Sequence, residues 1–165
     1  MATQNLIQYL ETSQYNALPV GGTLPIGEAA MNRRQVETFI SGAAIAANDL
    51  VCIDLSKTDN SEKVITIIPA DGAAATKRMC VGFALTTASG AGETVDVTIA
   101  GLHAEANCAD SGGAGVAVQA GDFLSPSAVA GRADEYVAGD TVPPIAYALT
   151  TAAGNKAAVF VIKQM

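Results

Sequence analysis

Two aspartates occupy matching places in a repeated sequence. Paired carboxylates commonly bind metal ions or act in acid–base catalysis. Asp49 lies in IAANDLV at 45–51, and Asp122 lies in VQAGDFL at 118–124. The Asn or Gly before each Asp tolerates a positive φ, and an Asp side chain accepts hydrogen bonds from nearby backbone amides. Because each Asp recurs at the equivalent place of a repeat, we interpret both as turn caps rather than as a catalytic pair.

The other residues with chemical potential do not form a catalytic pattern. His103 is the single histidine, and no motif places a nucleophile beside it, so we expect a structural or exposed role. Cys52, Cys80 and Cys108 have no CxxC spacing, and one is left over from any pairing. We expect the three thiols to be free and buried, and the protein to assemble in a reducing compartment. No phosphate loop, nucleophile elbow, zinc-protease motif or calcium loop occurs, so the sequence predicts no enzyme, no cofactor and no metal site.

Composition limits the partners of this chain. The 165 residues are half apolar, mostly Ala and Val, with no Trp and four each of Phe and Tyr. Large side chains dominate core energetics, so we expect a thin core that partners help to stabilise. A net charge of −7 with nine scattered Lys and Arg argues against nucleic acid, which needs clustered cations. No apolar run approaches the length of a membrane span and no signal peptide is evident, so we expect no membrane partner.

A longer repeat organises the elements around these residues. VGFALTTASG at 81–90 returns as IAYALTTAAG at 145–154, and a strand-like tail follows each copy, with Val97 aligned to Val161. Units of this size bury too little surface to be stable alone, so two copies should share one core. We predict pseudo-repeats at 43–101 and 116–165.

Buried positions follow from the same repeat. Leu85 and Leu149 stand in the identical ALTTA of the two copies, and we expect both to be buried. Val97 and Val161 should be buried as well. Alternation in the first copy places Val95, Val97 and Ile99 inward and the intervening Asp96 and Thr98 outward.

Many short strands with turn signals between them predict an all-β fold. We expect a small antiparallel β-barrel or β-tulip-like domain built from an internal duplication, with an extended N-terminal arm. The expected strands are 35–40, 50–55, 63–68, 79–85, 94–99, 101–108, 116–118, 122–124, 136–137, 145–149 and 158–162.

The arm covers 1–34 and precedes a β domain at 35–165. Residues 4–15 suit one short amphipathic helix, whereas two Pro and three Gly within 16–27 exclude both a helix and a central strand. Apolar side chains nevertheless alternate there as if to dock on a surface. That surface is either the chain's own domain or a neighbouring subunit, and we favour the neighbour. The predicted partner-binding residues are Leu6, Leu10, Leu18, Val20, Leu24 and Ile26.

The repeated Ala-(Asn/Gly)-Asp step, followed by VGFALTTASGAGETVDV at 81–97, resembles the small capsid decoration (cement) proteins of tailed bacteriophages. The resemblance covers about 43–165, and the two motif copies and the long arm depart from the family pattern. It implies a structural virion protein on the outer surface of a phage capsid, assembled in the host cytoplasm. Such a protein would act as a homotrimer and stabilise the capsid by bridging neighbouring major capsid protein subunits.

An alternative function is a head-fibre or tail-associated module that binds a receptor or a glycan. This function would need exposed aromatic side chains in a groove. The candidates are Tyr9, Tyr15, Tyr136 and Tyr147, and Tyr147 stands at a repeated position that we expect to belong to the core.

Overall fold

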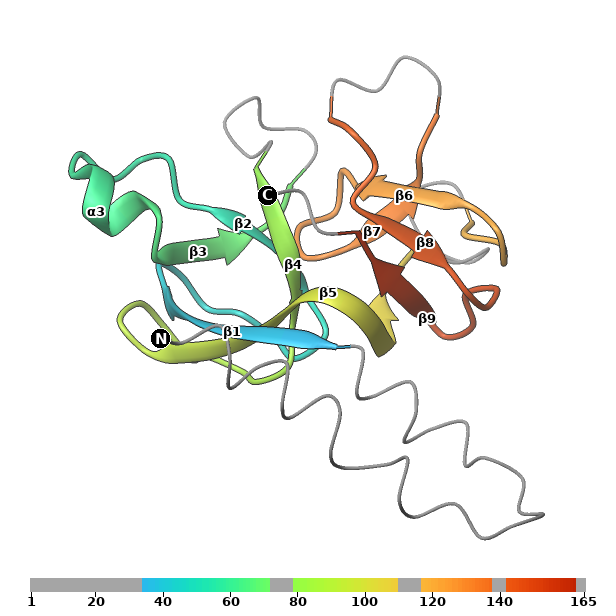
Figure 1. Cartoon of the computed structure of the whole chain (residues 1–165), viewed down its shortest axis with the longest axis horizontal. Helices are drawn as coiled ribbons and strands as arrows, with labels where there is room; N and C mark the ends of the chain where they lie inside the picture. Colours follow the sequence, from blue (N-terminus) through green and yellow to red (C-terminus); the bar gives the residue numbers. More distant parts are fainter. Residues whose placement is uncertain (1–33, 72–78, 110–116, 138–141, 163–165) are drawn as a thin grey trace, which may run out of the picture. The chain divides into compact units, whose positions relative to one another are not determined.

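A computed structural model describes residues 34–71, 79–109, 117–137 and 142–162, so all of the arm but its last residue lies outside the described part of the chain. The described residues form nine strands and one helical turn, which confirms the all-β prediction (Figure 1). The elements are β1 (Gln35–Ser41), β2 (Leu50–Ile53), α3 (Asn60–Lys63), β3 (Thr66–Pro69), β4 (Cys80–Ala84), β5 (Thr94–Asn107), β6 (Phe123–Pro126), β7 (Ala133–Glu135), β8 (Ala146–Ala148) and β9 (Lys156–Val161).

The first five strands close into a β-barrel. β1 pairs in parallel with β3, followed by β2, β4 and β5 in antiparallel order, and β5 returns to pair with β1. The predicted strand at 63–68 begins later, at Thr66, because the Asp59 carboxylate accepts the Ser61 amide and caps the single turn of α3. We call this barrel the first unit.

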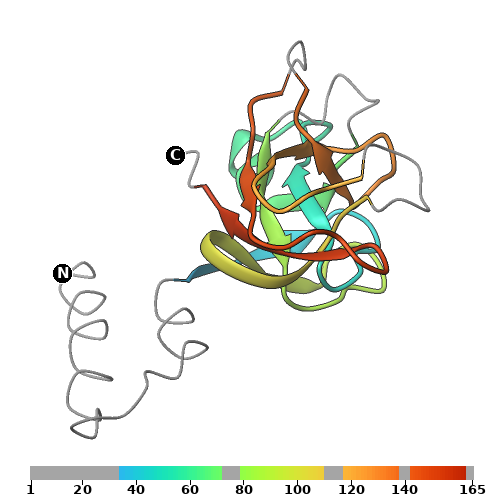
Figure 2. The same ribbon diagram turned by 90° about the vertical axis from the view of Figure 1, so that its right-hand side faces the viewer.

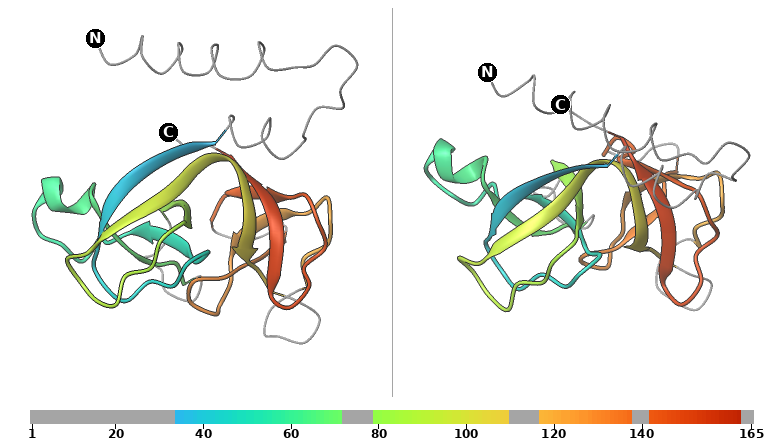
Figure 3. Two further views of the ribbon diagram at one scale, coloured as in Figure 1. Left: turned by 90° about the horizontal axis from the view of Figure 1, so that it is seen from below. Right: turned by 60° about the horizontal axis from the view of Figure 1, so that its bottom comes forward.

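β5 is long enough to serve two units. It bends at Gly101, where φ is 89°, and its second half pairs with β9 (Figure 2). β8, β6 and β7 follow, and a parallel bridge from Cys108 to Ala133 leads back to the end of β5. The order β7-β6-β8-β9 repeats the order β3-β2-β4-β5, and the end of β5 takes the place of β1. Figure 3 shows β5 arching from one unit to the other.

Hydrogen bonds give the register of the duplication. The Ala84 amide donates to the Asp49 carbonyl at 2.9 Å, and the Ala148 amide donates to the Asp122 carbonyl at 2.8 Å. The next strand differs from the sequence alignment, because Leu85 donates to Asp96 but Leu149 donates to Ala158. The second hairpin is therefore two residues shorter than the first, and Val97 corresponds to Val159.

This register changes the boundaries and preserves the faces. Because the second half of β5 stands in for β1, the second unit starts at Gly101 and includes a strand that 116–165 leaves out. A shift of two residues keeps every side chain on its own face of the strand. Val97 and Val161 are both buried, as predicted.

The interiors of the two units use corresponding positions. The first holds Phe39, Ile45, Val51, Ile67, Ala84, Ala88, Val95, Val97 and Ile99. Their counterparts in the second are Ala106, Val118, Leu124, Ala133, Ala148, Ala152, Ala157, Val159 and Val161. Alanine replaces three of the larger side chains, so the second core is the thinner of the two.

Three predictions of burial or exposure are wrong. Leu85 is only half-buried and Leu149 is 44% exposed, because Ala84 and Ala148 fill the two interiors and the next residue on the strand points outward. Thr98 was expected to face solvent, yet it is fully buried. The second unit covers this part of the outer surface of β5, where the Thr98 hydroxyl lies 3.1 Å from the His103 ring.

Candidate interaction surface

The two repeated aspartates are turn caps, as interpreted from the sequence. The Ala46 amide donates to Asp49 Oδ2 at 2.9 Å, and the Gln119 amide donates to Asp122 Oδ2 at 2.7 Å. Directly before each Asp, Asn48 has a φ of 71° and Gly121 a φ of 105°. Since the two caps belong to different units and each holds its own turn, they do not form a catalytic pair.

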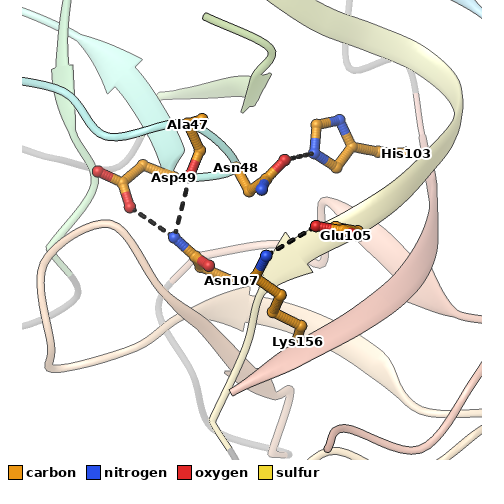
Figure 4. Close-up of polar contacts among 7 residues, drawn as sticks. All are labelled: Ala47, Asn48, Asp49, His103, Glu105, Asn107 and Lys156. Atoms are coloured by element: carbon orange, nitrogen blue, oxygen red, sulfur yellow. Dashed lines mark hydrogen bonds and ion pairs between the residues drawn. The ribbon is translucent and has the colours of Figure 1, made fainter. Parts of the chain in front are cut away.

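His103 belongs to the junction between the units. It is buried, with Nδ1 3.1 Å from Thr98 Oγ1 and Nε2 3.1 Å from Asn48 Oδ1 (Figure 4), and its ring lies beside the ring of Phe83. Burial, assisted by the charge of Arg34, lowers the pKa of His103 to about 4. The imidazole is therefore neutral at pH 7, and both of its nitrogens have structural partners.

Further polar contacts join the units around Asp49. The Asn107 side chain donates to Asp49 Oδ1 at 2.8 Å, and the Asn107 amide donates to the Asn48 carbonyl at 2.9 Å. Beside them, Lys156 forms an exposed ion pair with Glu105 at 2.7 Å (Figure 4). Burial raises the pKa of Asp49, while its hydrogen bonds oppose that shift. This polar cluster positions one unit on the other.

The thiols are buried and unreactive. Cys52, Cys80 and Cys108 are free and buried, which confirms the sequence prediction. Burial raises the pKa of Cys80 and of Cys108 to about 12, so both are protonated at neutral pH. Within the described ranges, no three His, Cys, Asp or Glu side chains gather as a metal site would require. No helix found in those ranges could span a membrane.

An aromatic surface distinguishes the second unit. In the first unit, the register aligns Leu50, Phe83 and Thr98 across β2, β4 and β5, and all three are fully buried under the second unit. The equivalent row across β6, β8 and β9 is Phe123, Tyr147 and Phe160. These side chains are 50%, 38% and 43% exposed.

Two flanking residues extend this row. Leu102 pairs with Phe160 on one side, and Tyr136 donates its amide hydrogen to the Phe123 carbonyl on the other, and both are half-buried. The rings of Phe123 and Tyr147 meet edge to face, with centroids 5.6 Å apart. We call Leu102, Phe123, Tyr136, Tyr147 and Phe160 the aromatic face.

The aromatic face corrects one sequence-based expectation. Tyr147 was assigned to the core because it matches Phe83, but the position is buried in only one copy. The exchange of Phe for Tyr was an available signal, since a phenol hydroxyl is favoured where one end of the ring meets water. The predicted arm residues Leu6, Leu10, Leu18, Val20, Leu24 and Ile26 lie outside the described residues.

Comparisons with known proteins find a likeness of fold. No protein-family model and no curated protein sequence matches the chain. Among solved structures, it is similar to the N base of head fiber gp8.5 of bacteriophage phi29, with a TM-score of 0.50 and 18% sequence identity. The match covers 79% of this chain and 95% of that one. At this level of sequence identity, the likeness shows a shared fold.

Proposed function

We propose that this chain is a structural component of a phage virion, located on the outer surface of the capsid, and that it is not an enzyme. The observation that carries the proposal is the likeness to a head-fibre base, which spans nearly the whole of that base. The sequence resemblance to capsid decoration proteins points to the same surface of the same kind of particle. The turn caps, buried thiols and neutral His103 have structural roles in the fold and leave contact area as the means of action.

The mechanism that we propose is bridging of neighbouring major capsid protein subunits by a homotrimer. Each chain would contribute its arm, whose apolar residues are Leu6, Leu10, Leu18, Val20, Leu24 and Ile26. An interface of about 800 Å² per partner is weak or strong according to its anchors, but repetition over a closed shell multiplies its effect. Assembly in the host cytoplasm agrees with three free thiols.

The test measures retention of the full chain on purified capsids and the melting temperature of those capsids. A variant carrying Leu18→Asp, Val20→Asp and Leu24→Asp should bind poorly and should protect capsids less from heat. Its control carries Gln4→Asp, Gln8→Asp and Gln14→Asp, which adds the same charge to polar arm positions. Equal binding by the two variants would rule out the arm as the clamp, and no binding of the unaltered chain to capsids would refute the proposal.

The aromatic face supports a second candidate, a head-fibre module that binds a receptor or a glycan. Flat, exposed rings such as Phe123, Tyr147 and Phe160 can stack on sugar faces. In this case, phage particles carrying Tyr147→Ala would keep the protein on the capsid and lose adsorption to host cells. Unchanged adsorption would remove this candidate.

A further inference from the structure

The two units present one equivalent outer surface in two different states. In the first unit, the Ala70 amide donates to the Leu50 carbonyl at 2.8 Å, and in the second, the Tyr136 amide donates to the Phe123 carbonyl at 2.7 Å. Leu50 and Ala70 are fully buried by the second unit, whereas Phe123 is half exposed. The segment that covers the surface of the first unit therefore indicates what kind of segment the open surface of the second unit can bind.

A short irregular segment with a glycine covers the first surface. In the turn between β6 and β7, the Gly131 carbonyl accepts the Leu50 amide at 2.8 Å, and the Gly131 amide donates to the Ala70 carbonyl at 2.7 Å. The segment thus inserts its backbone between two strand ends. Gly131 has a φ of 78°, and a Cβ there would lie 2.7 Å from Asp49 Cγ, so only glycine fits.

The second surface is open at the same place. Tyr136 donates to Phe123, but no bond from the Phe123 amide to the Tyr136 carbonyl is found among the backbone hydrogen bonds of the described chain. This amide and this carbonyl are the counterparts of the two groups that hold Gly131. Around them stand larger and more exposed apolar side chains than in the first unit. The aromatic face thus has two features of a docking site. Its apolar side chains are exposed, and the Phe123 amide and the Tyr136 carbonyl are placed to bind a backbone segment as their counterparts bind Gly131.

The first unit's own counterpart of the covering turn is a poor occupant. That counterpart is the connection at 54–65, and the Ile65 carbonyl, which stands where Gly131 stands, already accepts the Ile40 amide at 2.8 Å. The Ile65 amide also donates to the Glu62 carbonyl at 3.3 Å, so a second copy would have to break that bond to repeat the Gly131 contact with this segment.

The arm offers a better match. Val20-Gly21-Gly22-Thr23 repeats the order of Val129-Ala130-Gly131-Arg132, with a β-branched residue, a small residue, a glycine and a polar residue. Leu18 and Leu24 flank it with apolar side chains. The Pro and Gly residues of this segment disfavour a helix and a central strand, so we expect an irregular backbone like that of the covering turn.

We propose that residues 18–24 of a second copy of this chain lie on the aromatic face, with Gly22 at the place that Gly131 takes in the first unit. A contact between an arm and a different surface is heterologous, and it closes into a ring when the rotation allows. The inference rests on the homotrimer of the proposed function and specifies its joint. It can be tested with purified protein alone, separately from binding to capsids.

The experiment measures the mass of the full chain by sedimentation across a concentration series. Phe123→Asp should weaken association by about tenfold or more, as should Val20→Asp, because each places an unpaired charge in an apolar contact. Gly22→Ala should also weaken it, whereas Gly21→Ala, at the counterpart of Ala130, should not. Thermal unfolding checks that each variant is folded, and Val64→Asp serves as an exposed control outside both surfaces.

Mixing the two variant chains tests whether the arm binds the aromatic face of a second copy or that of its own chain. The Phe123→Asp chain keeps a working arm and the Val20→Asp chain keeps a working face, so the two together should form a mixed species although each fails alone. No mixed species, a monomeric unaltered chain, or normal assembly of Phe123→Asp would overturn the inference. Dissociation by Val64→Asp but not by Val20→Asp would assign the contact to 54–65 and overturn the arm as occupant. Loss of capsid or glycan binding by Phe123→Asp with assembly intact would overturn the joint while leaving virion attachment standing.

Discussion

Equivalent residues in the two units have taken different roles. Asp49 and Asp122 make the same cap, but only Asp49 also receives the Asn107 side chain at the junction. Phe83 is buried beside His103, while its counterpart Tyr147 is exposed beside Phe123. A repeated sequence position therefore predicts the local backbone and leaves burial open.

His103 should make stability depend on pH. Its folded pKa of about 4 lies below the ordinary histidine pKa of 6.5, so the unfolded chain binds the extra proton first as pH falls. Stability is therefore full above about pH 6.5 and is lost progressively towards pH 4, by up to about 3 kcal/mol. Urea unfolding of the full chain across this range, compared with His103→Gln, measures the effect. An equally steep pH dependence in the variant would show that carboxylates such as Glu93 and Glu105 account for it.

At the scale of elements, β5 and the turn between β6 and β7 hold the two units together. β5 supplies the last strand of one unit and the first of the other, with its bend at Gly101. The turn adds backbone hydrogen bonds from Gly131 to Leu50 and Ala70. The two units thus share β5, and the turn of the second unit inserts between two strands of the first.

Substitution of two glycines should separate backbone strain from the contact between the units. Gly121→Ala forces an Ala to a φ of 105° with open space around its Cβ, which should cost about 1–2 kcal/mol. Gly131→Ala has a similar backbone cost and also drives its Cβ into the Asp49 carboxylate, so the loss should reach about 3 kcal/mol or more. The free energy of unfolding in urea measures both. Equal losses would mean that the turn moves away from Asp49 at little cost.

At the scale of the whole molecule, the β domain should unfold as one cooperative body. The buried cluster around the second interior includes Leu50, Cys52 and Phe83, which come from the outer surface of the first unit. Neither unit can expose that surface without losing part of the shared core. Small single domains of this kind show two-state transitions.

Phe83→Ala and its counterpart Tyr147→Ala should differ sharply in cost. Phe83 is fully buried, so its truncation should cost about 3–5 kcal/mol, whereas Tyr147→Ala at the open surface should cost less than about 1 kcal/mol in the monomer. Amide hydrogen exchange of β4 and β8 under mild denaturant gives the second readout. Phe83→Ala should lower the protection of both strands together. Loss of protection in β4 alone would show that the units unfold separately.

The sequence by itself determined the features that depend on neighbours along the chain. Alternation of apolar residues predicts the inward-facing Val95, Val97 and Ile99, and the Asn-Asp and Gly-Asp steps predict the two turn caps. The ALTTA repeat indicates that one unit occurs twice. These features follow from strand periodicity and turn chemistry, which act over a few residues.

Only the tertiary structure decided which repeated surfaces are buried and which are open. The burial of Thr98 and the exposure of Tyr147 were both predicted wrongly, because the second unit covers the outer surface of the first unit while its own equivalent surface stays open. Part of that cover comes from Gly131, which is distant in sequence from Leu50 and Ala70, the residues that it contacts. Tertiary structure likewise decided that β5 continues from one unit into the other, since this one strand pairs with β1 in its first half and with β9 in its second. The alternation of residues along a strand carries no information about what packs against that strand. Packing between the units buries this face of the first unit and leaves the equivalent face of the second exposed.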